Sequence, residues 1–127
     1  MKIAISSQGE NLSSLVDPRF GRCSYFLFID SETEKFEALP NPALEAMGGA
    51  GIQAAQTIVD KGVEVVVTGN VGPNAFQTLK TADIKIFGGA TGTVKEALEK
   101  YKNGELKEYS TFSVPRHFGL GEKGDQK

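Results

Sequence analysis

Two arginines and several glycine-rich turns are the residues of this sequence whose types and spacing best suit chemistry. Arg19 and Arg22 flank a Phe-Gly pair, and each guanidinium offers a planar fork of N–H donors that suits an anion. Glycine-rich turns at residues 69–72 and 88–92 each precede a stretch with helical character. A helix N-terminus presents free N–H groups and the positive end of the helix dipole, so these turns also favour an anion. The pattern predicts an anion-binding site.

The residues predicted to form this site lie in turns or at the starts of helices. Any one glycine turn is more often a simple chain reversal, so the functional interpretation depends on several turns meeting at one place. None of the turns contains the Gly-Lys-Ser/Thr of a phosphate-binding P-loop or the full dinucleotide-binding fingerprint. The predicted site residues are Arg19, Gly21, Arg22, Gly49, Gly51, Gly69, Asn70, Gly72, Asn74, Gly89, Thr91 and Gly92.

Three side chains are candidates for binding a metal. Cys23 is the single cysteine, which excludes an internal disulfide and zinc sites built from several thiolates of one chain. A lone cysteine is most often a small buried hydrophobic residue. As a thiolate ligand, Cys23 would need partners from a bound cluster, from another chain or from His117, which has no second histidine beside it. Met47 offers a soft thioether, although a hydrophobic contact is its expected role.

The sequence offers no catalytic constellation. Spacing supports no serine–histidine–acid arrangement, and no pair of carboxylates lies at the ends of the predicted strands. The first strand ends on Ser6, where a metal-dependent nuclease would place an aspartate. Asp17, Asp60 and Asp83 are interpreted as capping or solvated residues. We therefore expect a protein that binds its ligand without catalysing a reaction.

The elements that position these residues follow from hydrophobic periodicity. Four valines within residues 63–67 predict a strand covered on both faces, because β-branched side chains suit a buried pleated surface. Pro73 suits the first position of a helix, and Thr93 has capping-box spacing with Glu96. The predicted strands are 2–6, 25–29, 35–39, 63–67 and 84–87; the predicted helices are 52–61, 73–81 and a third that begins after Thr93 and stops at Asn103.

The order of these elements indicates an α/β fold. Strands and helices alternate from residue 63 onward, which is typical of parallel strands joined by right-handed crossovers. Residues 30–34 have hairpin length, so strand 25–29 is expected to run antiparallel to its neighbours. Ligands of open α/β sheets bind at the carboxyl edge of the strands. The loops expected to gather at that edge are 7–22, 41–51, 69–72 and 88–92.

The composition is that of one globular domain. The chain has 127 residues, of which 39% are hydrophobic and 24% are charged. These values suit a single core and argue against wholesale disorder. The net charge of −2 argues against binding nucleic acid or an anionic membrane through a broad basic surface. Residues 1–115 are predicted to form the domain and residues 116–127 a loosely held tail. The short apolar start and the single cysteine predict a cytoplasmic protein.

Several motifs resemble the dinitrogenase iron–molybdenum cofactor biosynthesis family. They are Arg-Phe-Gly-Arg at residues 19–22, Gly-Ala-Gly at 49–51, and Thr-Gly-Asn-x-Gly-x-Asn-Ala-Phe at 68–76. The sequence from residue 92 to about residue 106 is also similar to the closing pattern of that family. The resemblance implies a three-layer α/β/α fold of the ribonuclease-H-like type, with three helices and a five-stranded mixed sheet whose second strand is antiparallel.

The resemblance also implies a function. It points to a non-enzymatic binding or carrier protein for an iron–molybdenum, iron–sulfur or other molybdenum-containing sulfide cluster, acting in cofactor assembly or delivery. A P-loop ATPase or a cluster-assembly protein is the implied partner. The loop at residues 44–49 lacks the histidine that cofactor-binding members commonly carry there. Two alternatives stay open: an enzyme or binding protein for a phosphorylated metabolite or nucleotide, and a protein-interaction module.

Overall fold

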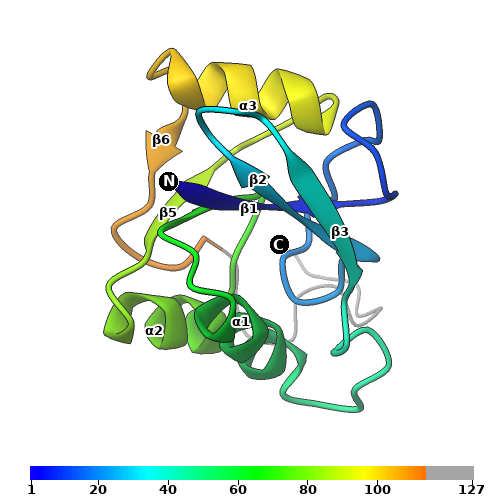
Figure 1. Cartoon of the computed structure of the whole chain (residues 1–127). Coiled ribbons are helices and arrows are strands. Elements are labelled where there is room, and N and C mark those ends of the chain that lie inside the picture. Colours follow the sequence, from blue (N-terminus) through cyan, green and yellow to red (C-terminus); the bar gives the residue numbers. More distant parts are fainter. Residues whose placement is uncertain (114–127) are drawn as a thin grey trace.

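Figure 1 shows the computed structural model of the chain, which describes residues 1–113. A mixed sheet forms the middle layer, with two helices on one face and the third on the other (Figure 1). The elements are β1 Lys2–Ser7, β2 Tyr25–Asp30, β3 Phe36–Pro40, α1 Ala50–Asp60, β4 Val65–Val67, α2 Pro73–Thr81, β5 Lys85–Gly88, α3 Val94–Lys102 and β6 Lys107–Glu108. This is the predicted three-layer α/β fold.

The sheet has the strand order β3-β2-β1-β4-β5-β6. β1 is antiparallel to β2 and parallel to β4, while β4 and β5 are parallel to each other. β3 is antiparallel to β2 and therefore runs in the same direction as β1. As predicted, β1, β3, β4 and β5 end at the same edge of the sheet.

The central strands are covered on both faces. Ala4 and Val66 face the hydrophobic cluster under α1 and α2. Their neighbours Ile5 and Val67 face the cluster under α3. This alternation follows from the two-residue period of a strand, and it explains why the valine run carries almost no polar residue.

One strand was not predicted. β6 consists of Lys107 and Glu108, both exposed, so no apolar alternation marks it in the sequence. Its pairing with Phe87 and Gly88 of β5 defines it. The sheet therefore has six strands rather than the five expected.

The first helix begins earlier than predicted. α1 starts at Ala50 instead of residue 52, because Gly49 adopts a left-handed φ of 71° and ends the loop there. Gly51 consequently lies inside the helix and not in the preceding turn. The tail predicted at residues 116–127 lies outside the described residues. Within residues 1–113, no helix has the length and hydropathy needed to cross a bilayer.

The contact between Gly88 and Tyr109 yields a test of how β6 is held. A Cβ placed on Gly88 would collide with the Tyr109 ring. We expect Gly88→Ala to lower the free energy of unfolding by about 1–3 kcal/mol, because the ring must move. Urea unfolding monitored by circular dichroism measures this change.

Gly48→Ala is the matched control, since a Cβ at Gly48 meets nothing within 4 Å. It should leave stability nearly unchanged. In a Tyr109→Ala background the Gly88→Ala substitution should cost much less, because the colliding ring is absent. An equal cost in both backgrounds would contradict the assigned contact.

Candidate functional site

The loops predicted to converge do meet at the carboxyl edge of the sheet. Arg19 forms an isolated parallel bridge with Asn70, and the Asn70 N–H donates to the Pro18 carbonyl at 2.7 Å. The Gly89 N–H donates to the Gly69 carbonyl at 3.1 Å. The first loop therefore lies against the turn after β4, and that turn lies against the one after β5.

The segment of residues 18–22 also contacts the start of α1, which in turn contacts the start of α2. A Cβ on Gly21 would lie 3.1 Å from the Gly51 Cα, and a Cβ on Gly51 would lie 3.4 Å from that of Ala75. Arg22 Nη1 donates to the Leu44 carbonyl at 3.1 Å, which ties the segment to the loop before α1. The starts of α1 and α2 are thus neighbours, with residues 18–22 beside them.

Neither of these two helix starts has a side-chain cap. The N-cap residues are Gly49 for α1 and Gly72 for α2, and neither first turn contains an acidic residue. The first N–H groups of a helix have no partner within the helix, and they favour negative charge. We call residues 18–22, 49–52 and 72–75 the paired-terminus site.

The start of α3 has a different character. The Glu96 N–H donates to Thr93 Oγ1 at 3.1 Å in a complete capping box, as predicted. The Val94 N–H donates to the Ser14 carbonyl at 2.8 Å, and the Lys95 N–H donates to another carbonyl of the same loop. These amides are satisfied by the protein itself, so α3 adds no N–H groups to an anion site.

Thr91 and Gly92 were predicted to belong to the anion site, and the structure places them elsewhere. They line a shallow hollow beside α3 together with Glu96, Glu99, Lys100, Asn103 and Glu105. Three carboxylates outnumber the single ammonium there, so this part of the edge suits the predicted anion less well than the starts of α1 and α2. The predicted anion site is therefore confined to the part of the carboxyl edge that lies next to α1 and α2.

Two contacts from the C-terminal part of the chain reach the turn after β4. Tyr109 donates its hydroxyl proton to the Gly69 carbonyl at 2.9 Å. The Val71 N–H donates to Ser113 Oγ at 2.9 Å. No sequence signal predicted these residues. The bonds to Ser113 and Pro18 occupy the N–H groups of Val71 and Asn70, so these two amides of the turn do not supply donors to an anion.

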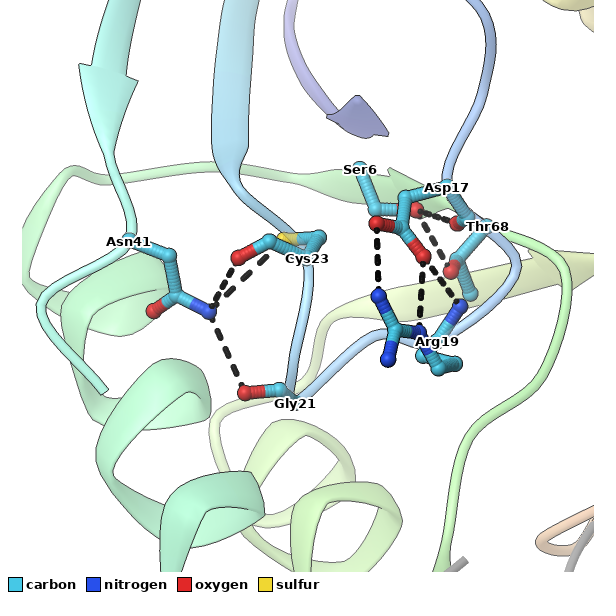
Figure 2. Close-up of polar contacts among 7 residues, drawn as sticks. All are labelled: Ser6, Asp17, Arg19, Gly21, Cys23, Asn41 and Thr68. Carbon is cyan, nitrogen blue, oxygen red and sulfur yellow. Dashed lines mark hydrogen bonds and ion pairs between the residues drawn. The ribbon is translucent and has the colours of Figure 1, made fainter. Parts of the chain in front are cut away.

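Arg19 is held by a buried carboxylate (Figure 2). Asp17 accepts hydrogen bonds at Oδ1 from the Arg19 N–H at 3.0 Å and from Nε at 3.3 Å. Its Oδ2 accepts from Nη2 at 3.4 Å. The Asp17 side chain is 2% exposed and that of Arg19 is 44% exposed. Of the two interpretations of Asp17, the solvated one was therefore wrong, whereas the bond from the Arg19 N–H is a local cap of the other kind. The ion pair with Arg19 compensates for burial.

The residue between the two arginines anchors the segment. Phe20 is buried, and its ring centroid lies 5.2 Å from that of Phe26 in a tilted arrangement. This hydrophobic anchor fixes the backbone on either side of it. The guanidinium groups of Arg19 and Arg22 consequently project from a segment that cannot move freely.

Cys23 is a buried thiol. Its side chain is fully buried, and desolvation together with the nearby charge of Asp17 raises the pKa of this thiol well above its ordinary value of 9.0. Asn41 donates its Nδ2 protons to the carbonyls of Gly21 and Cys23 at 3.1 and 3.0 Å (Figure 2). This position suits a small hydrophobic residue and does not suit a thiolate ligand.

Of the other two candidate metal ligands, Met47 is described by the structure, and it is exposed whereas Cys23 is buried. Met47 lies at the surface of the loop before α1 with 95% of it exposed. His117 lies outside the described residues. Among residues 1–113, no three His, Cys, Asp or Glu side chains gather closely enough to hold a metal ion. The described part of the chain thus presents donors for an anion rather than a ligand set for a bare metal.

A family model described as dinitrogenase iron-molybdenum cofactor matches residues 1–104. An uncharacterized protein of Methanocaldococcus jannaschii is 30% identical over 112 residues, which cover 86% of this chain and 92% of that protein.

Two solved structures share the fold over most of their length. The apo form of the orange protein from Desulfovibrio gigas has a TM-score of 0.86 and 36% identity, and the match covers 89% of this chain and 96% of that one. A Thermotoga protein described as a NifB candidate has a TM-score of 0.78 and 42% identity, with 89% and 97% covered.

Asn74 in the first turn of α2 yields a test of the paired-terminus site. Asn74→Asp places a negative charge at a helix N-terminus, which should raise stability by up to about 1 kcal/mol. The same charge should weaken binding of an anionic probe such as tetrathiomolybdate by about tenfold through repulsion. Thermal unfolding and a titration of the probe measure the two effects.

Gln77→Glu adds the same charge to α2 one turn further from its start, and it should change binding much less. Stability and binding are thus expected to change in opposite directions at residue 74. Unchanged binding by Asn74→Asp would contradict an anion at this helix start.

Cys23 yields a second test. The folded protein should not react with a thiol reagent at pH 8, whereas the protein unfolded in urea should release one equivalent of thionitrobenzoate. Because the folded pKa of Cys23 lies above the unfolded one, the contribution of Cys23 to stability should be constant below pH 9 and should fall above it, where only the unfolded state loses the proton. Rapid labelling of the folded protein would contradict the assigned burial.

Proposed function

Because the chain belongs to the dinitrogenase iron-molybdenum cofactor family, we propose that it is a non-enzymatic binding or carrier protein for an anionic metal–sulfur cluster. It would act in the assembly or delivery of a cofactor of the iron–molybdenum, iron–sulfur or other molybdenum sulfide type. The observation that carries the proposal is the meeting of two uncapped helix starts beside Arg19 and Arg22.

The chemistry of such a cluster suits this site. The sulfides of the cluster already coordinate its metals, so the protein has to bind a preformed anion. Backbone N–H groups at the starts of α1 and α2 would donate to the sulfides. The two guanidinium groups would add directed, positively charged donors. A protein with a net charge of −2 can bind an anion in this way, because the favourable field is local.

The two sulfur-containing candidates for metal ligands, Cys23 and Met47, have different roles in this proposal. Cys23 is buried and protonated, so it would not ligate the cluster. Met47 is exposed on the loop that leads into α1, and its thioether is free to contact a cluster seated at the helix start. The Desulfovibrio gigas relative is described as an apo form, which supports a role in holding a separable group.

The proposal is tested with the full-length protein under anaerobic conditions. The protein is incubated with tetrathiomolybdate, or with iron, sulfide and molybdate, and is then desalted. We expect retained metal by elemental analysis and a visible absorption band. A colourless, metal-free protein would contradict the cluster role. Strong thermal stabilisation by nucleotides, with none by thiomolybdate, would favour a phosphorylated ligand at the same site.

Arg22→Gln tests the site assignment in the same assay. The substitution removes the charge and the guanidinium donor to the Leu44 carbonyl while keeping a polar side chain. We expect binding to weaken about tenfold, as for the loss of one charge-assisted hydrogen bond. Lys85→Gln removes the same charge at the start of β5, on the opposite edge of the sheet, and should leave binding unchanged. Equal effects of the two variants would mean that net charge alone governs binding.

A further inference from the structure

Asp17 occupies a place at the candidate site that calls for a functional explanation. A carboxylate that is 2% exposed is expensive to bury unless it is paired and hydrogen-bonded. Its partner, Arg19, is half-exposed and lies in the paired-terminus site. Because Asp17 is buried while the Arg19 guanidinium is half-exposed, the ion pair presents the guanidinium to a ligand at the surface.

Asp17 is itself connected by hydrogen bonds to the ends of the two central strands. The Asp17 N–H donates to the Ser6 carbonyl at 3.0 Å, and Ser6 Oγ donates to the Asp17 carbonyl at 2.7 Å. Ser6 Oγ lies 2.7 Å from Thr68 Oγ1, and this hydroxyl pair is buried (Figure 2). Ser6 belongs to β1, and Thr68 follows β4 directly. Asp17 is therefore fixed to the rigid centre of the sheet.

The ion pair determines which N–H groups of Arg19 remain available. A guanidinium has five N–H donors, and Asp17 takes one from Nε and one from Nη2, which leaves three. An arginine without such a partner would sample many rotamers in water. Held by Asp17, Arg19 offers the remaining donors in one orientation, with a buried countercharge beside it.

We propose that Asp17 is a positioning residue for the anion site and that it converts Arg19 from a mobile cation into a fixed set of hydrogen-bond donors. The inference rests on the proposed function. It predicts that the ligand is selected by the geometry of the donors more than by net charge, which favours a large anion with several acceptor atoms over a small halide.

Asp17→Asn separates this role from a simple countercharge. The amide keeps an oxygen for the Arg19 N–H but loses the ion pair, so the backbone turn is retained. If Asp17 positions Arg19, tetrathiomolybdate should bind about tenfold more weakly, even though the site has gained one positive charge. If Asp17 were only a countercharge, the same variant would bind more tightly. Titrations of the full-length protein at low and high salt measure this, and the variant should show the steeper salt dependence.

A double-mutant cycle assigns the effect to Arg19. In an Arg19→Gln background, Asp17→Asn should cause little further loss of binding. Arg19→Lys keeps the charge but not the fork and should bind about as weakly as Arg19→Gln. An equal loss from Asp17→Asn in both backgrounds would mean that Asp17 acts through the backbone turn, and the inference would be overturned.

A measurement on the ligand-free protein makes the test independent of binding. The Nε–H signal of Arg19 should be protected from exchange with water in the NMR spectrum, and Asp17→Asn should remove that protection. An unprotected signal in the unsubstituted protein would overturn the inference alone. Failure of the unsubstituted protein to retain thiomolybdate would overturn the proposed function and this inference with it.

Discussion

Residues 18–22 reach the starts of α1 and α2 because glycine stands at the points of closest backbone approach. A Cβ on Gly69 would lie 2.6 Å from the Pro18 Cα, and one on Gly21 would lie 3.1 Å from the Gly51 Cα. A side chain at Gly69 would push the first loop off the turn after β4, and one at Gly21 would push it off α1. Most other features of the candidate site follow from this packing, including the position of both arginines.

The same packing divides the carboxyl edge into two regions of opposite electrostatic character, one that favours an anion and one that disfavours it. Beside α1 and α2, helix dipoles and two guanidinium groups favour an anion. Beside α3, the amides are capped by the protein, and glutamates line the surface. A chain with a small net negative charge can thus present one positive region without becoming a general binder of polyanions.

The site is linked to the fold through the ends of β1 and β4. These parallel strands are neighbours, yet the chain leaves β1 toward α3 and leaves β4 toward α2. Open α/β sheets bind ligands where neighbouring connections diverge in this way. Here the buried hydroxyl pair of Ser6 and Thr68 and the carboxylate of Asp17 fill the point of divergence. Polar groups are tolerated there because each has a hydrogen-bond partner.

The sequence by itself determined the elements and their direction. The valine run, the proline that starts α2 and the Thr93 capping box are local signals, because each depends on residues close in the chain. From these, the shared edge and its glycine turns could be predicted. Local signals could not show which turns face one another, so Thr91 was grouped with Asn70 although it lines a hollow beside α3 that contains three glutamates and one lysine. Whereas the burial of Cys23 is the role that a lone cysteine most often has, local signals could not show that Asp17 is buried or that β6 exists. Those facts depend on contacts between residues far apart in the chain, which only the tertiary structure decides.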